Sequence, residues 1–240
     1  MMLKTVYFQI KMKNINEMTA EWILYEDNHL LIVNKPVKIP VQKDKTGDDC
    51  LIDLGKHYIK KKYNKPGEVF LGLPHRLDRP VSGIVILSKT SKSLSRITKL
   101  FREKKIKKKY WAIVKNKIEK PSGHLTHYLK KNKKLNKSFS SLNEKNGFLK
   151  AELKYKLLKK LENYFLYEIT LITGRHHQIR VQLSSIGSPI KGDIKYNAKR
   201  TNKDGSINLH ARQIEFIHPI KQKKISITAP PPNSSIWTTS

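Results

Sequence analysis

The segment HRLDRPVSG, residues 75–83, places one carboxylate, Asp78, between Arg76 and Arg79 in a chain whose formal net charge is +30. Neighbouring guanidinium groups favour the ionised form of a carboxyl group. An ionised Asp78 has no proton to give, so it is a poor general acid at neutral pH, but it can act as a nucleophile or stabilise positive charge. These residue types therefore indicate nucleophilic or electrostatic chemistry centred on Asp78.

A second pair of arginines lies further along the chain, in TGRHHQIR, residues 173–180. The chain has 41 Lys but only 8 Arg, and these two segments hold four of the eight. Because a guanidinium grips carboxylate or phosphate with two parallel hydrogen bonds and an ammonium does not, we expect both segments to need arginine. A strand end and a helix start can bring Arg175 or Arg180 against Asp78. A structural Asp–Arg pair that fixes a turn would give the same pattern.

Aromatic residues follow the longest basic run of the middle of the chain. The run KKIKKK, residues 104–109, leads directly into Tyr110 and Trp111. Rings among lysines suit stacking on bases beside a surface that binds phosphates. A strand whose aromatic side chains pack into the core is the competing interpretation, and the lysines alone are equally typical of a solvated face.

The overall charge points to the class of partner. Lys and Arg number 49 against 19 Asp and Glu, which favours a phosphate polymer because neutralising phosphates releases counterions. A lysine-rich proteome would produce part of this excess without any function. Hydrophobic residues make up 38% of the chain and form clear runs, so a folded core is expected. No run approaches the roughly 18 apolar residues of a membrane span, which predicts a soluble, cytoplasmic protein without a membrane partner.

Other common chemistries lack their characteristic residues. Cys50 is the single cysteine, which excludes an intrachain disulfide and any multi-cysteine metal site. His124 with His127, and the adjacent His176 and His177, have no acidic partner motif, so no metal site is predicted. The chain also has no phosphate-binding loop, dinucleotide fingerprint or G-x-S-x-G elbow, so chemistry without a cofactor is expected.

The elements that must position these residues are strands interrupted by a few helices. Short apolar runs predict strands, and apolar residues at helical spacing predict helices. The expected strands lie within 23–36, 83–89, 108–115, 164–173, 207–219 and 223–232, and the expected helices within 48–63, 91–106 and 176–187. Residues 149–161 fit a strand or a helix. Residues 115–150 are rich in Lys, Asn and Ser and show little periodicity, and within them residues 130–147 are expected to form a long loop or a loosely held hairpin. The predicted fold class is α+β, with a mixed, mostly antiparallel sheet.

Three regions divide the chain. Residues 1–20 are predicted to be an N-terminal extension or a first edge strand, residues 21–230 the catalytic domain, and residues 231–240 a frayed tail. No internal repeat is present.

From about residue 22 to 230, ordered blocks of the sequence resemble the pseudouridine synthase family that modifies ribosomal and transfer RNA. The blocks are ILYEDNHLLIVNKP, HRLDRPVSGIVILSKT, KKYWAIV, KAELKY, TGRHHQIRVQLSSIGSPIKGDIKY and LHARQIEFIHP. The resemblance is to the branch of large-subunit rRNA and tRNA enzymes, without an added N-terminal RNA-binding domain. It implies an isomerase that converts uridine to pseudouridine in RNA without cofactor or metal, on a sheet divided by a catalytic cleft with flanking helices and loops.

The resemblance also implies roles for individual residues. Asp78 matches the catalytic aspartate, which attacks either the uracil 6-carbon or the anomeric carbon, and Arg180 matches the arginine that pairs with it. Tyr110 matches the tyrosine that stacks on the target ring and takes the ring proton late in the reaction. Arg76 matches an arginine that occupies the gap left by the extruded base. The further residues expected to bind RNA are Arg79, Lys109, Arg175 and His177. The protein is expected to be a monomer.

The sequence departs from the family pattern at Lys38, where glycine is frequent, and at Ser188 and Gln182, where histidine is frequent. These departures bear on local turn geometry and supporting hydrogen bonds, and substrate choice is assigned to the poorly matched residues 115–150. Two other functions remain open. An RNA-binding protein without activity would use the same basic surface, and a glycosidase-like hydrolase would need a second carboxylate, for which Asp193 is the nearest motif candidate.

Overall fold

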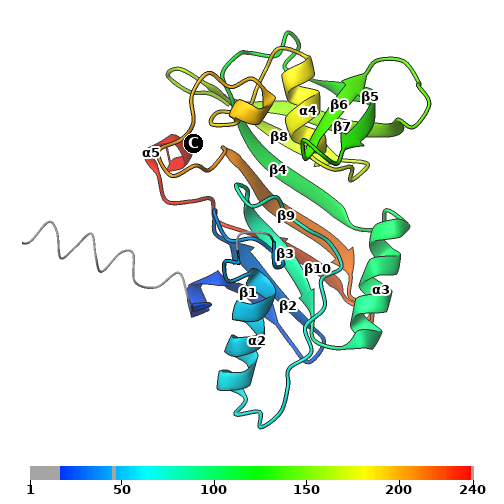
Figure 1. Ribbon diagram of the computed structural model, residues 1–240, viewed down its shortest axis with the longest axis vertical. Coiled ribbons are helices and arrows are strands. Elements are labelled where there is room, and N and C mark those ends of the chain that lie inside the picture. The colour runs from blue at the N-terminus through cyan, green and yellow to red at the C-terminus, as the bar shows by residue number, and fades with distance from the viewer. Residues whose placement is uncertain (1–16, 45–46, 239–240) are drawn as a thin grey trace, which may run out of the picture.

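Ten strands form one sheet within residues 17–44 and 47–238, which are the residues that the computed structural model describes (Figure 1). The strands are β1 (Ile23–Glu26), β2 (Leu30–Lys35), β3 (Ser82–Ser88), β4 (Lys107–Val114), β5 (Ser122–Asn132), β6 (Lys137–Ser141), β7 (Leu149–Lys160), β8 (Phe165–Leu171), β9 (Leu209–Ile217) and β10 (Lys224–Thr228). The helices are α2 (Leu51–Lys62), α3 (Ser91–Arg102), α4 (Gln178–Ser185) and α5 (Ser235–Thr238), with short 3-10 turns η1 (Ala20–Trp22) and η2 (Ile194–Tyr196). The strand order is β1-β2-β3-β9-β4-β8-β7-β5-β6, and β10 pairs with β9.

The long strands β4 and β9 join the two halves of the sheet (Figure 1). Every neighbouring pair is antiparallel except β3 and β9, which run parallel through Ser82 opposite His210 and Gly83 opposite Ala211. Gly83 makes this contact possible, because its φ is +112° and a Cβ there would clash with the backbone of Ala211. The predicted α+β fold with a mixed, mostly antiparallel sheet is confirmed. The pocket described below lies at this junction.

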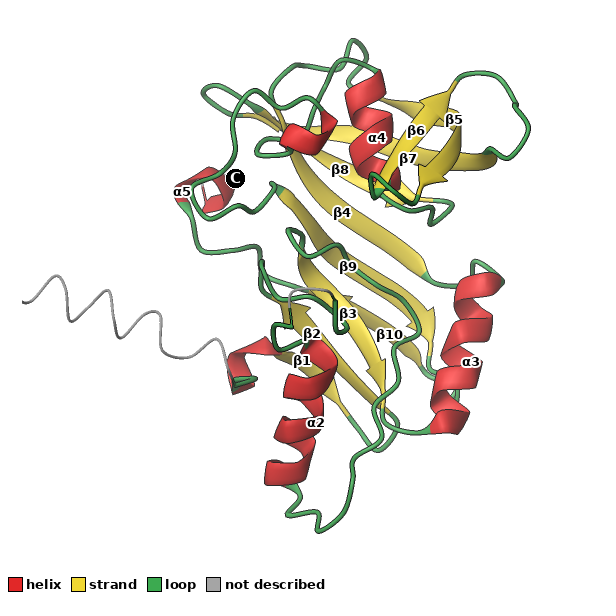
Figure 2. Cartoon of the chain, in the orientation of Figure 1, coloured by secondary structure: helices red, strands yellow, loops and turns green. Residues whose placement is uncertain are grey.

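The half of the sheet around β2 and β3 holds the main apolar core. Strand β3 is buried along its whole length, as its β-branched sequence predicts. Helices α2 and α3 lie against this half of the sheet (Figure 2), and Leu54 and Ile97 join Ile86 in one apolar cluster. Both helices fall within the predicted ranges 48–63 and 91–106, because their apolar residues recur on one face.

The other half of the sheet corrects one prediction. Residues 122–160 form three antiparallel strands, β5 to β7. For residues 130–147 the expected long loop is wrong and the hairpin alternative is right, because β5 and β6 pair there across a short turn. Alternate residues point inward and hold these strands in place: Leu129 and Ala151 pack with Val181 and Tyr196 beneath α4. The same alternation makes 149–160 a strand although Leu, Ala, Glu and Lys favour helix, because burial of one face outweighs propensity.

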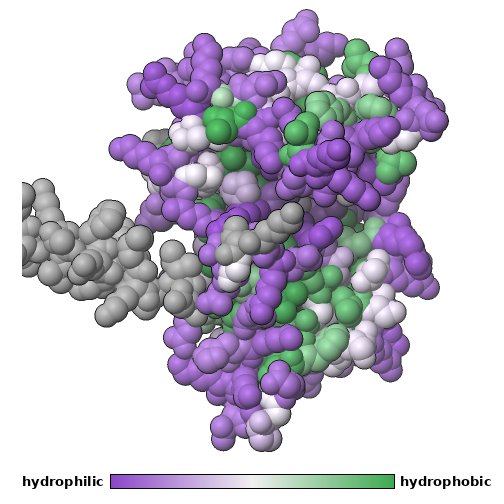
Figure 3. All heavy atoms as spheres, in the orientation of Figure 1, coloured by the Kyte–Doolittle hydropathy of each residue, from purple (hydrophilic) through white to green (hydrophobic). Residues whose placement is uncertain are grey.

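The two ends of the chain differ from the predicted extension and tail. Within the tail, Ser235–Thr238 forms α5, and Trp237 is 4% exposed among Ile113, Leu161 and Leu166, so the predicted fraying is wrong for these residues. The indole gains more by burial than the short segment loses in conformational entropy. Most of the predicted N-terminal extension lies outside the described residues. Hydrophilic residues cover most of the face seen in Figure 3, in line with the high charge.

Candidate active site

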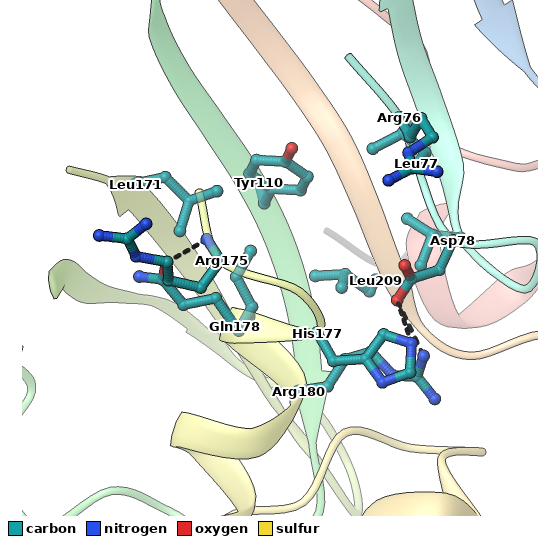
Figure 4. Close-up of a pocket in the computed structure, with 12 residues that line it drawn as sticks. Arg76, Leu77, Asp78, Tyr110, Leu171, Arg175, His177, Gln178, Arg180 and Leu209 are labelled. Atoms are coloured by element: carbon teal, nitrogen blue, oxygen red, sulfur yellow. Dashed lines mark hydrogen bonds and ion pairs between the residues drawn. The ribbon is translucent and has the colours of Figure 1, made fainter. Parts of the chain in front are cut away.

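A pocket opens at the junction of β3, β9 and β4, beside the start of α4 (Figure 4). Its polar lining residues are Arg76, Asp78, Tyr110, Arg175, His177, Gln178 and Arg180, and its apolar ones are Leu77, Val81, Leu171, Ile179 and Leu209. The two segments singled out from the sequence by their arginines therefore meet in space. The pocket combines a carboxylate, basic groups and apolar walls, which suits a planar, uncharged ring attached to an anionic chain.

Asp78 is held by a guanidinium. Arg180 donates from Nη1 to Asp78 Oδ2 at 2.8 Å, which confirms the expectation that Arg175 or Arg180 reaches Asp78. The side chain of Asp78 is 29% exposed, whereas that of Arg180 is 6% exposed. The arginine is thus part of the protein interior, and the carboxylate remains open to the pocket. An anion in this position is stabilised by its partner and still accessible to a substrate.

A second carboxylate anchors the same guanidinium from behind. Arg180 donates from Nε and Nη2 to the two oxygens of Asp193, at 2.7 and 2.8 Å. The side chain of Asp193 is 1% exposed. This two-point contact fixes the plane of the guanidinium, which leaves Nη1 aimed at Asp78. Asp193 is therefore committed to Arg180 and does not face the pocket, which disfavours the hydrolase alternative.

Backbone contacts fix the segment that carries Asp78. Its carbonyl accepts the N–H of Val81 at 3.0 Å, which closes a tight turn immediately before β3. The next carbonyl, of Arg79, accepts the N–H of Lys38 at 3.0 Å, and the buried Nζ of Lys35 lies 3.3 Å from it. Lys38 has a φ of +72°, which explains why glycine suits this position in the family pattern.

Gln178 holds the loop that leads into α4. Its Oε1 accepts the hydroxyl of Thr173 at 2.8 Å and the N–H of Arg175 at 2.9 Å, and its Nε2 donates to the carbonyl of Glu152 at 3.0 Å. The next residue toward the N-terminus, His177, caps the helix with a left-handed φ of +53°. A strained backbone held by a buried amide is common where a side chain must point at a functional site.

Tyr110 forms one wall of the pocket from β4, with its ring 8% exposed beside Leu171 and Leu209 (Figure 4). Burial, and secondarily the negative charge of Asp78, raises the pKa of Tyr110, so the phenol keeps its proton at neutral pH. The ring presents an apolar surface on which another ring can stack.

The other residues predicted to bind RNA occupy different surroundings. Arg76 is exposed at the pocket, and Arg175 also lines it while donating to the carbonyl of Lys150 at 3.1 Å. The remaining residues pair with acidic groups away from the pocket lining: Arg79 with Asp44 and Asp48, and Lys109 with Glu168 at 3.1 Å. These placements leave the roles of all four as predictions.

His177 sits beside Asp78 and is almost fully buried. Its Nε2 lies 3.5 Å from Asp78 Oδ2, and its side chain is 6% exposed. Burial lowers the pKa of His177 to about 3, although the charge of Asp78 acts in the opposite direction. The ring is therefore neutral at physiological pH. Tyr196, which contacts this ring, was missed by sequence reasoning; its only signal was its place three residues after Asp193.

Within 17–44 and 47–238, no group of three or more His, Cys, Asp or Glu side chains is arranged to hold a metal ion. No helix in the described part of the chain is long and apolar enough to cross a bilayer.

The sequence matches a known protein family and its members. Residues 29–185 match the family model described as RNA pseudouridylate synthase. Ribosomal large subunit pseudouridine synthase C of Buchnera aphidicola subsp. Schizaphis graminum is 40% identical over 216 residues, covering 87% of this chain and 66% of that protein. This chain thus spans just under two thirds of that relative. The Rickettsia bellii protein of the same name is 32% identical over 232 residues, covering 96% and 75%.

A solved structure agrees with the fold. Human RNA pseudouridylate synthase domain containing 4 superposes with a TM-score of 0.75 at 25% identity, over 95% of this chain and 94% of the other.

Proposed function

Because the chain belongs to the RNA pseudouridylate synthase family, we propose that it isomerises specific uridines in RNA to pseudouridine, with Asp78 as the nucleophile. The observation that carries the proposal is the Asp78 carboxylate, open to the pocket and bonded at 2.8 Å to a buried guanidinium. An RNA-binding protein would not need an anion at the centre of a basic pocket, since the anion repels phosphates.

The reaction balances without a redox partner. The bond between the anomeric carbon and N1 of uracil breaks, and a bond between that carbon and C5 forms. C5 loses its hydrogen as a proton and N1 takes one up, so substrate and product have the same composition. Asp78 forms a transient bond to the uracil 6-carbon or to the anomeric carbon and is released at the end. We therefore propose that no cofactor or metal takes part.

The remaining residues serve the flipped-out nucleoside in this proposal. Extruding a uridine from a stack costs a few kcal/mol, which contacts between phosphates and the basic surface offset. Tyr110 stacks on the extruded uracil, and Arg76, exposed at the mouth of the pocket, fills the space that the base leaves. Because Tyr110 is protonated, its hydroxyl can accept the C5 proton only if it passes its own proton on.

The names of the relatives favour ribosomal RNA of the large subunit as the substrate, with transfer RNA as the other candidate. We place substrate choice in residues 115–150, whose strands β5 and β6 pack against α4, the helix that carries Arg180 to the pocket. We further propose that the protein acts as a cytoplasmic monomer.

Mapping pseudouridines in RNA from cells with and without the gene tests the proposal. One or more uridines should lose the modification in the deletion strain and regain it with the wild-type gene, but not with Asp78→Asn. A map that is unchanged by deletion, with RNA binding intact in the purified protein, would favour the inactive RNA-binding alternative.

A further inference from the structure

The hydroxyl of Tyr196 connects three parts of the protein at the active site. Tyr196 Oη accepts the N–H of Ser138, in β6, at 2.8 Å, and lies 2.8 Å from Nδ1 of His177. Its ring also lies under the Arg180 guanidinium, whose central carbon is 5.0 Å from the ring centroid. Tyr196 is 2% exposed, so no water competes for these contacts.

The partners of this hydroxyl determine where its proton goes. Ser138 is a backbone donor, so the tyrosine oxygen must accept there. Among the described residues, the phenol proton has no hydrogen-bond acceptor other than His177 Nδ1. A neutral imidazole that accepts at Nδ1 carries its own proton on Nε2. That edge is the one that lies 3.5 Å from Asp78 Oδ2, where an N–H is favourable and a lone pair would be repelled.

The same arrangement distinguishes the two oxygens of Asp78. Arg180 and His177 both approach Oδ2, whereas Oδ1 has no hydrogen-bond partner among the described residues. The hydrogen bond from Arg180, with the Nε2 edge of His177 next to it, holds one oxygen in place, which leaves the other free to form a bond. Oδ1 is therefore the attacking atom if Asp78 acts as the proposed nucleophile.

We propose that Tyr196 is a positioning residue, which fixes the tautomer and ring orientation of His177 and thereby directs Oδ1 of Asp78 toward the substrate. The inference deepens the proposed function, on which its catalytic consequence rests. Tyr196 also accepts a hydrogen bond from Ser138 in β6. One side chain therefore positions both the β5–β6 hairpin and, through His177, the carboxylate of Asp78. The left-handed backbone of His177 supports the same role, since it turns the ring toward both partners.

Tyr196→Phe tests the inference, because it removes one hydroxyl and keeps the ring over Arg180. In the wild-type protein without RNA, nitrogen NMR should show an unprotonated Nδ1 and a protonated Nε2 for His177. In the variant, the Nδ1-protonated tautomer should appear. The rate of pseudouridine formation at saturating RNA should fall about tenfold, the effect of one buried hydrogen bond, while RNA affinity stays within about twofold of wild type.

Tyr167→Phe is the matched control. Tyr167 is also fully buried and its hydroxyl also accepts a backbone N–H, from Ile118 at 3.0 Å, but it lies outside the pocket lining. Its loss should reduce stability by a similar amount and leave the rate and the His177 tautomer unchanged. In a His177→Ala background, adding Tyr196→Phe should lower the rate no further, because Tyr196 acts through His177.

An unchanged His177 tautomer in Tyr196→Phe would overturn the inference, and so would equal losses of rate in the two phenylalanine variants. These outcomes are separate from the failure of the proposed function. If the wild-type protein forms no pseudouridine, the proposed reaction is wrong, and the NMR result alone decides whether Tyr196 sets the tautomer.

Discussion

Asp193 should be essential to the site although it does not face the pocket. Asp193→Asn keeps the shape of the side chain but removes its charge, and its amide group would oppose one N–H of Arg180. Breaking one partner out of a buried ion pair costs about 3–5 kcal/mol, because the other charge is left uncompensated. Both side chains are nearly inaccessible here, with exposed fractions of 6% for Arg180 and 1% for Asp193. Because Arg180 keeps its hydrogen bond to the partly exposed Asp78, the lower end of the range, about 3 kcal/mol, is expected.

Urea denaturation measures this cost. With a slope of about 2 kcal/mol per molar urea, the midpoint of unfolding should fall by about 1.5 M. Release of tritium from 5-tritiated uridine in RNA should be at least about tenfold slower below the unfolding transition, because the guanidinium plane is no longer fixed. Glu215→Gln, which removes exposed ion pairs to Lys107 and Lys224, is the control and should shift the midpoint little. Equal midpoints for the two variants would refute the reasoning.

Three further predictions concern other residues. Tyr110→Phe should bind RNA as tightly as wild type but form pseudouridine more slowly; a wild-type rate measured under single-turnover conditions would exclude the hydroxyl as the base. Lys108→Gln should reduce the salt slope of RNA binding by about 1, whereas Lys109→Gln should change it less, because Glu168 already neutralises Lys109. Lys108 lies over the Phe101 ring and has no acidic partner among the described residues. The opposite order of the two slopes in a salt titration would contradict this. Burial lowers the pKa of His210 to about 4, so the unfolded chain takes up the proton at a higher pH than the folded protein does. The free energy of unfolding should therefore fall as the pH drops from about 6.5 toward 5, and His210→Asn should make this dependence less steep in urea titrations. A variant curve as steep as that of wild type would count against a buried, neutral His210.

Local patterns in the sequence predicted most of the helices and strands, but they did not clearly predict β5 to β7. Strand β3 follows from a continuous β-branched run that is buried along its whole length, and helices α2 and α3 follow from apolar residues that recur on one face. In β5 to β7, lysines occupy the outward positions, and the inward ones include Ala151 and Ser138, which are weak hydrophobic signals. These strands are defined by contacts with α4 and Tyr196, which no local pattern contains.

The sequence predicted those residues of the candidate site whose neighbours along the chain are unusual for their type. Asp78 stood out as an acid among arginines, and the choice of arginine over lysine pointed to Arg180. The supporting residues did not stand out, because their partners are brought close only by the fold: Asp193 meets Arg180 through η2, and Tyr196 meets His177 there as well. Charge alone also could not show that Arg79 already pairs with acidic residues.

The nucleophilic role of Asp78 is tested most directly by the single-turnover rate of pseudouridine formation in Asp78→Asn, measured together with RNA affinity. An amide cannot attack as a carboxylate does, so the account predicts no detectable product while the RNA still binds at least as tightly, since a repulsive charge has been removed. Product formation by Asp78→Asn at a rate near that of wild type would show that another group makes the bond to the nucleoside.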